Sequence, residues 1–322
     1  MAWRTRIKDR IRIKNQLGRE TLAEFIGTFI LLLIGDGSVA QSVLSRNASG
    51  AYLSVNLAWG LAVTMGVFFA GGVSGGHINP AVSLTNCILG RLPWFKLLPY
   101  MLAQYLGAFT AAAVVFAVYN DALNNFDGGV RITGYGANAT AGIFSTFPKE
   151  YVSTWTGLGD QIVGTALLVG CIQAITDKNN FSPSDRGIKA ISIGFVVLAI
   201  GLSLGHNCGY AINPARDLGP RILTSIAGWG VSPFSFRNYN WFWVPIVGPH
   251  IGAILGAWMY LLFSGIHSEN DSWQSDSSDL QLDTTTIGSS VTSLNSMRVG
   301  TYHRDRPQYK SHWDNGVGIT KF

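Results

Sequence analysis

The stretch Gly209-Tyr210-Ala211-Ile212-Asn213-Pro214-Ala215-Arg216-Asp217 has the form of a helix start. Asn213 is a residue type that caps helix N-termini, Pro214 suits the first helical position, and apolar residues follow at helical spacing. The tetrad at its centre, Ile-Asn-Pro-Ala, also occurs at residues 78–81, again before a short apolar run. One such tetrad would indicate only an ordinary capped helix. Two copies at matching places in an apolar chain indicate two related halves.

The composition favours a membrane protein over two soluble domains. Charged residues make up 13% of the 322 residues, about half the share usual in soluble proteins. The net charge of +5 could suggest nucleic acid, but much of it lies in a basic run before the first apolar segment. Such a run is typical of a cytoplasmic flank near anionic lipid. The 3 scattered cysteines indicate neither a disulfide framework nor a metal site, and we expect no cofactor and no nucleic acid partner.

Six segments are long and apolar enough to cross a bilayer, which takes roughly 20 residues each. They are residues 21–44, 53–71, 93–119, 155–176, 187–204 and 242–264. We therefore predict an all-α membrane protein with a basic N-terminal tail (1–20), a membrane domain (21–264) and a disordered C-terminal tail (265–322). Basic residues favour one side of the segments, which predicts that both termini are cytoplasmic.

The two halves, residues 21–119 and 155–264, carry corresponding motifs. Glu24-x-x-Gly27 in the first apolar segment matches Gln161-x-x-Gly164 in the fourth. Three segments per half is an odd number, so the second half enters the membrane from the opposite side. The helices that begin at the tetrads are apolar but too short to cross. We predict two re-entrant half-helices in an inverted repeat, with their capped N-termini meeting at the centre.

Two helix N-termini that point at one spot concentrate partial positive charge there. The side-chain amides of Asn79 and Asn213 would then offer N–H donors to a water or hydroxyl oxygen. An oxygen held as an acceptor from both sides cannot relay protons. Arg216 lies one helical turn after Asn213 and is expected to point into the pore, the alternative being a salt bridge to Asp217. This arrangement predicts a pore for neutral solutes that excludes ions and protons.

These residues resemble the aquaporin superfamily, the major intrinsic proteins, over about residues 20–265. The resemblance lies in the duplicated tetrad, in Ser74-Gly75-Gly76-His77 before its first copy, and in Arg216-Asp217 after its second. It implies an aquaporin-like fold, one pore per protomer, and a homotetramer in the cell membrane. It also implies that both tetrads line the pore, through Asn79, Pro80, Ala81, Asn213, Pro214 and Ala215.

The same resemblance places a selectivity filter at Trp59, Gly201, Tyr210 and Arg216. The two aromatic residues would offer apolar faces to a carbon backbone, and the arginine would bind hydroxyl groups. Glycine at 201 would widen the filter where water-selective relatives carry histidine. Further positions resemble the glycerol-conducting branch, the aquaglyceroporins: Tyr119, Asp217, Arg221 and Pro245-Ile246.

Three more sets of residues are expected around the pore. Irregular backbone before each half-helix has unpaired carbonyl groups for solute hydroxyls, at Gly75, Gly76, His77, Gly209, Tyr210 and Ala211. Loop support is expected from Glu24, Asp217 and Gln161, the last standing where the family usually has a second glutamate. Candidate glycosylation sequons begin at Asn47 and Asn138, in loops predicted to be extracellular.

We expect a passive channel for glycerol, water and other small neutral solutes such as urea, and not an enzyme. A water-selective channel is the nearest alternative. A secondary transporter can also use broken helices, but it needs a coupling-ion site, and no paired carboxylates occur in the predicted spans. An enzyme is disfavoured because no nucleophile–base pair or phosphate loop stands out. Asp36 is unusual in an apolar segment, and the sequence assigns it no role.

Overall fold

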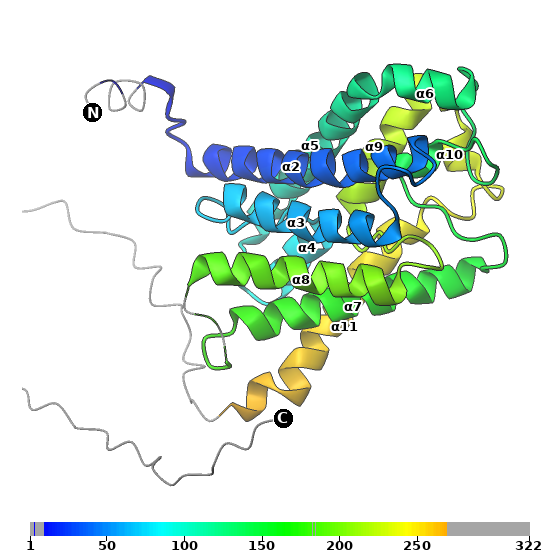
Figure 1. Cartoon of the computed structure of the whole chain (residues 1–322). Helices are drawn as coiled ribbons and strands as arrows, with labels where there is room; N and C mark the ends of the chain where they lie inside the picture. Colours follow the sequence, from blue (N-terminus) through cyan, green and yellow to red (C-terminus); the bar gives the residue numbers. More distant parts are fainter. Residues whose placement is uncertain (1–2, 4–9, 182, 184, 269–322) are drawn as a thin grey trace, which may run out of the picture. The chain divides into compact units, whose positions relative to one another are not determined.

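The structure, a computed structural model, describes residues 3, 10–181, 183 and 185–268 (Figure 1). Helices are the only regular secondary structure among these residues. Most of the predicted C-terminal tail (269–322) and part of the N-terminal tail (1–2 and 4–9) lie outside them.

Six helices in the described part of the chain are long and apolar enough to cross a membrane, as predicted. They are α2 (Gln16–Leu44), α3 (Tyr52–Ala70), α5 (Leu97–Val118, preceded by the turn η1, Trp94–Lys96), α7 (Thr154–Thr176), α8 (Arg186–Leu204) and α11 (Val244–Phe263, followed by η4, Gly265–His267). The first begins at Gln16 rather than at Thr21, because the Asn15 side chain accepts a hydrogen bond from the Gly18 N–H and caps the helix there.

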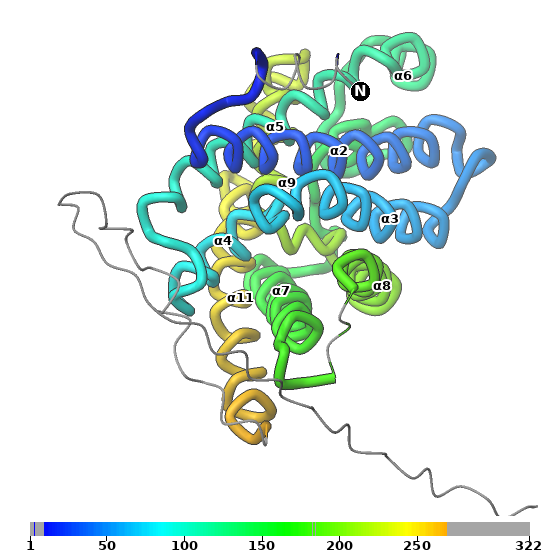
Figure 2. Tube along the Cα trace, turned by 90° about the vertical axis from the view of Figure 1, so that its left-hand side faces the viewer, coloured from blue at the N-terminus to red at the C-terminus, as the bar shows by residue number. Residues whose placement is uncertain are grey.

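Two short helices begin at the two tetrads: α4 (Pro80–Ile88) and α9 (Pro214–Thr224). The residue before each helix is extended, and its side chain caps the helix. Asn79 accepts from the Ala81 N–H, and Asn213 accepts from the N–H groups of Ala215 and Arg216. In Figure 2 both short helices lie between α2 and α5 on one side and α7 and α11 on the other.

The two halves pack on each other reciprocally. In the first half α2 packs on α3 and α5, and in the second α7 packs on α8 and α11, while α3 meets α8 across the halves. Each short helix contacts the last long helix of the opposite half, α4 on α11 and α9 on α5. Figure 1 shows α2 and α7 running in opposite directions. The predicted inverted repeat is therefore present.

Close helix approach in each half depends on glycine. A Cβ on Gly107 of α5 would lie 2.3 Å from the Phe25 carbonyl oxygen of α2. A Cβ on Gly252 of α11 would lie 2.2 Å from the Ile162 carbonyl oxygen of α7. Both contacts join a helix backbone directly to its neighbour, the packing typical of membrane helices.

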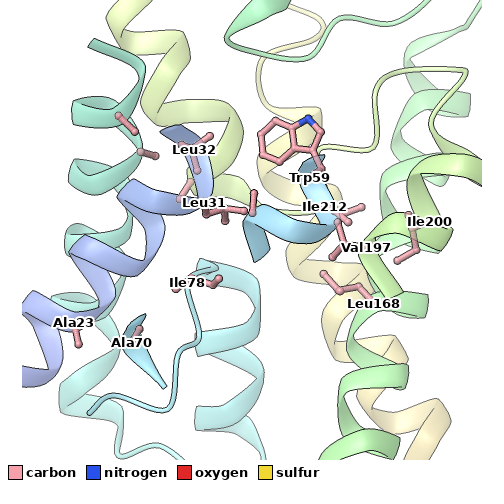
Figure 3. Close-up of a cluster of buried hydrophobic side chains, with 14 residues drawn as sticks. Ala23, Leu31, Leu32, Trp59, Ala70, Ile78, Leu168, Val197, Ile200 and Ile212 are labelled. Atoms are coloured by element: carbon pink, nitrogen blue, oxygen red, sulfur yellow. The ribbon is translucent and has the colours of Figure 1, made fainter. Parts of the chain in front are cut away.

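An apolar cluster holds the segments that precede the short helices. Ile78 and Ile212, each next to a capping asparagine, are buried with side chains from four long helices: Leu31, Leu32, Trp59, Leu168, Val197 and Ile200 (Figure 3). Packing on these helices fixes where the two helix starts lie.

Short helices that the sequence did not predict occur in the connection between the halves and after α9. It includes α6 (Asn120–Asp127), which ends at Gly128 in the left-handed conformation, and the turn η2 (Ala141–Ile143). After α9 follow a π-helical turn, η3 (Ser225–Trp229), and α10 (Ser232–Ser235). Residues 144–146, just after η2, reach the region of α9 described below.

Candidate pore

The N-termini of α4 and α9 meet through two reciprocal hydrogen bonds. Asn79 Nδ2 donates to the Ile212 carbonyl at 2.9 Å, and Asn213 Nδ2 donates to the Ile78 carbonyl at 2.8 Å. The sequence predicted that the helix ends meet but not that each amide binds the opposite half. A carboxamide has two N–H groups, so one on each asparagine stays available to a solute. Both residues line an inner cavity of about 220 Å³.

The segments before the asparagines, residues 74–79 and 208–213, are called the first and second tip loops below. Positive φ angles recur at matching places, at Gly75, Gly76 and Ile78 in the first and at Gly209, Tyr210 and Ile212 in the second. For the isoleucines this conformation is strained, and their burial in the apolar cluster holds it. Among the described residues, no backbone N–H donates to the six carbonyls predicted to face solutes. These carbonyls can therefore accept from a solute.

Glu24 of α2 supports the first tip loop. Its carboxylate is fully buried and accepts from the backbone N–H of His77 at 2.9 Å and of Ile78 at 2.7 Å. It also accepts from the Ser74 hydroxyl and, at 2.8 Å, from Gln104 Nε2. One carboxylate therefore satisfies four donors that burial removes from water.

Gln161 of α7 takes the equivalent place at the second tip loop. Its Oε1 accepts from the Ile212 N–H at 3.0 Å, and its Nε2 donates to Cys208 Sγ at 3.1 Å. Cys208 in turn donates to Asp160 Oδ2 at 2.7 Å. The amide oxygen thus accepts from the residue before the capping asparagine, as the Glu24 carboxylate does in the first loop, while the amide nitrogen binds the thiol.

Asp217 supports a third segment, residues 144–146. It accepts from the Thr146 N–H at 2.8 Å and from the Thr146 hydroxyl at 2.6 Å. It also forms an ion pair with Arg221 at 2.7 Å, and the buried guanidinium donates to the carbonyls of Thr146 and Pro233. Asp217 is therefore the partner of Arg221, and the alternative of an Arg216–Asp217 salt bridge is wrong.

Trp59, Tyr210 and Arg216 line both the inner cavity and an outer cavity of about 300 Å³, so they lie where the two adjoin. The Arg216 guanidinium carbon is 4.4 Å from the centre of the Trp59 ring, and Nη1 donates to the Phe144 carbonyl at 3.1 Å. This contact and the cation–π interaction fix the guanidinium. Its other N–H groups can serve a solute.

Gly201 lines neither cavity, which differs from its predicted place on the lumen. A Cβ there would lie 2.2 Å from Asn56 Oδ1 and 2.8 Å from the Tyr210 hydroxyl oxygen. Tyr52 also donates its hydroxyl to the Gly201 carbonyl at 2.7 Å. The space left by the missing side chain is therefore filled by Asn56 and Tyr210. Gly201 affects the lumen through Tyr210, and Asn56, which sequence reasoning missed, lines the outer cavity.

The inner cavity is lined by both apolar and polar groups. Apolar side chains of the long helices line it at Val63, Val67, Leu168, Ile172 and Val197. Its polar lining includes the two asparagines, Arg216 and residues of the tip loops. A second arginine, Arg91, also lines this cavity and donates to Gln173, a contact that no sequence motif indicated. Such a lumen can contact both the carbon atoms and the hydroxyl groups of a small solute.

Asn47 and Asn138, the asparagines of the sequons in the loops predicted to be extracellular, are both exposed. Arg46 Nη2 donates to Asn138 Oδ1 at 3.2 Å, which places the two sequons in one surface region. Their glycosylation stays a prediction. No group of three or more metal-ligating side chains occurs among the described residues.

Comparison with known proteins gives consistent matches. The family model described as Major intrinsic protein matches residues 12–260. The chain is 53% identical over 267 residues to Aquaporin-10 of Milnesium tardigradum; the match covers 80% of this chain and 65% of that relative, slightly under two thirds of its length. It is 48% identical over 260 residues to Aquaporin-9 of Homo sapiens, covering 81% of this chain and 87% of the relative.

A solved structure agrees with these matches. The X-ray structure of the aquaglyceroporin from Plasmodium falciparum superposes with a TM-score of 0.69 at 30% identity, covering 76% of this chain and 95% of that chain. The family model spans most of this chain, and the tip loops, capped short helices and inverted repeat are all present. The chain therefore belongs to the major intrinsic protein family.

Proposed function

We propose that this protein is a passive channel for glycerol, water and other small neutral solutes such as urea, and that it is not an enzyme. The observation that carries the proposal is the pair of cavities lined by apolar and polar groups, which share Trp59, Tyr210 and Arg216 in their linings. The names of the matched relatives, aquaporins and an aquaglyceroporin, support it.

Each part of the lumen would act on a different part of a polyol. Carbon atoms would slide along Trp59 and Tyr210, while hydroxyl oxygens would accept from Arg216 and from the free N–H groups of Asn79 and Asn213. Hydroxyl hydrogens would be donated to the tip-loop carbonyls. Because both asparagines donate to one oxygen, and both helix N-termini carry partial positive charge, protons and cations would be excluded.

We also propose that the channel is a homotetramer in the cell membrane with both termini in the cytoplasm. Residues 21–264 would form the membrane domain. The disordered tail predicted from residue 265 would begin only after the turn η4 (Gly265–His267), which is helical. Apolar side chains exposed on the long helices, such as Phe69, Leu106 and Leu255, are suited to contact lipid or neighbouring protomers. The sequons at Asn47 and Asn138 would then face the outside.

The test is permeation through the purified full-length protein in proteoliposomes. Stopped-flow light scattering with osmotic gradients of a non-permeant sugar, glycerol or urea measures water and solute flow, with protein-free liposomes as the control. We expect water and glycerol flow well above the control. Glycerol flow at the control rate would contradict the proposal.

A water-selective channel is the second candidate, and one observation favours it. Asn56 and the Tyr210 ring occupy the space that glycine at 201 was expected to leave open. On this alternative, Asn56 and Tyr210 leave the lumen between Trp59, Tyr210 and Arg216 wide enough for water but too narrow for glycerol. Water flow without glycerol flow in the same experiment would establish this alternative.

A further inference from the structure

Asp36 of α2 is a fully buried carboxylate that the pore arrangement above does not use. Neither of its oxygens has a hydrogen-bond partner among the described residues. The cation it faces is the filter arginine: Asp36 Oδ1 lies 3.8 Å from Arg216 Nη1. A charged group with no hydrogen bond is costly to bury unless an opposite charge compensates it.

The carboxylate lies in the wall of the constriction and lines neither cavity. The preceding residue, Gly35, packs so closely on Trp59 that a Cβ there would lie 2.3 Å from the ring. The face of the same ring is in contact with the Arg216 guanidinium. Asp36 therefore contacts the arginine from within the protein and not from either cavity.

The other charged groups nearby are already paired. Asp217, adjacent to Arg216 in the chain, forms its ion pair with Arg221 at 2.7 Å. Arg216 itself has one protein hydrogen bond, to the neutral Phe144 carbonyl. Within the described residues, Asp36 is therefore the one carboxylate that lies within ion-pair distance of Arg216.

We propose that Asp36 is a positioning residue for Arg216, which draws the guanidinium against the wall and balances its charge, so that the arginine binds solute hydroxyls weakly enough to release them. The inference rests on the proposed function and concerns its specificity. Without the carboxylate, the guanidinium would still be held by Trp59 and the Phe144 carbonyl, but its charge would be unopposed, so it would hold polar solutes and anions more tightly.

The test compares the parent with Asp36→Asn, which has nearly the same shape and no charge. Because water and glycerol use the same channels, the ratio of their permeabilities does not depend on how many channels fold. We expect the glycerol-to-water ratio to fall about threefold to tenfold, since a small change in the barrier for the larger solute has this effect. Asp36→Glu, which restores the charge, should recover at least part of the ratio.

A second readout reports the charge of Arg216 directly. Nitrate is a small planar anion that suits an unopposed guanidinium. Replacing chloride by nitrate at constant ionic strength should slow water flow through Asp36→Asn and leave the parent unchanged. Asp36→Ser, which is smaller and also neutral, takes the place of the asparagine variant if the latter does not fold.

The matched control is Asp127→Asn, which removes a buried carboxylate from an ion pair with Arg131 away from both cavities. The glycerol-to-water permeability ratio of this variant, and the effect of nitrate on its water flow, should equal those of the parent. An Asp36→Asn channel with the parent ratio and no nitrate response would overturn the inference. If the parent conducts water but no glycerol, the proposed function fails, and the nitrate response of water flow alone decides the role of Asp36.

Discussion

The two tip loops have nearly the same backbone, yet different side chains support them. Glu24 receives four hydrogen bonds at the first loop, two of them from backbone N–H groups. Gln161 receives one at the second loop, from the Ile212 N–H. In both loops one of these bonds comes from the backbone N–H of the residue directly before the capping asparagine, which is Ile78 in the first loop and Ile212 in the second.

This difference shows what the geometry requires. One acceptor at the N–H before the asparagine is common to both loops, so that bond is the part of the support that the two turns share. The negative charge is not shared, because a neutral amide serves the second loop. The carboxylate of the first loop has additional donors to satisfy, from Ser74, His77 and Gln104. Removing the supporting side chain should therefore reduce the stability of the protein more at the first loop than at the second.

The largest effect is expected for Glu24→Ala. It leaves several buried donors without an acceptor, and each such donor costs about 1–3 kcal/mol of stability. The free energy of unfolding should therefore fall by more than about 3 kcal/mol. The midpoint of thermal unfolding in detergent should fall by roughly 6–12 °C. Glu24→Gln is the control, because it keeps acceptors in place and imitates the second half, and it should lose less than half as much. Equal midpoints for Glu24→Ala and the parent would show that the carboxylate does not support the loop.

Gln161→Ala should have a smaller effect, because it leaves the Ile212 N–H as the one backbone donor without a partner. We expect a loss of about 2 kcal/mol, seen as a fall of roughly 4–8 °C in the same measurement. Thr176→Ala at the far end of α7 removes a side-chain bond within its own helix and serves as the control. A Gln161→Ala loss as large as that of Glu24→Ala would remove the contrast between the loops.

A further difference between the loops concerns position 210, where the second loop has Tyr210 and the first has Gly76. Gly201→Ala would place a Cβ against Asn56 and Tyr210 and push the tyrosine towards the lumen. Glycerol permeability should fall about tenfold, equivalent to about 1.4 kcal/mol, with a smaller fall for water. Gly159→Ala, where a Cβ would meet nothing within 4 Å, is the control. Unchanged glycerol flow would show that Tyr210 does not set the width.

The smallest effect is expected at the feature that the two loops share, the reciprocal asparagine bonds. Asn79→Ser and Asn213→Ser keep a side chain that can cap the helix but remove the bond to the opposite half. Each variant should lose about 1 kcal/mol of unfolding free energy. The two losses should be equal because the bonds are reciprocal. Unequal midpoints for the two variants would show that one of the bonds carries more of the contact.

Much of this arrangement could be predicted from the sequence. Hydropathy located the six long helices, and the Asn-Pro pairs located both capped starts, because these signals are local. Glu24 and Asp217 were expected to support loops, although the partners Gln104, Thr146 and Arg221 were not identified. Such contacts join segments far apart in the chain, and no local pattern encodes them.

The same limit explains Gly201 and Asp36. The sequence shows that residue 201 has no side chain but not which neighbours fill the space, and Asn56 and Tyr210 do so. It shows an acidic residue within an apolar segment but not the arginine it faces, because Asp36 and Arg216 belong to different halves. Both positions depend on how the halves pack.

The reciprocal asparagine bonds have a consequence for biogenesis. The half that leaves the ribosome first has a half-helix whose asparagine lacks the carbonyl it will bind, because that carbonyl belongs to the half still being made. The first half therefore lacks this contact until residue 212 has been made, whereas tandem soluble domains can complete their contacts one after the other. The centre of the channel closes only when the second tip loop has reached the first.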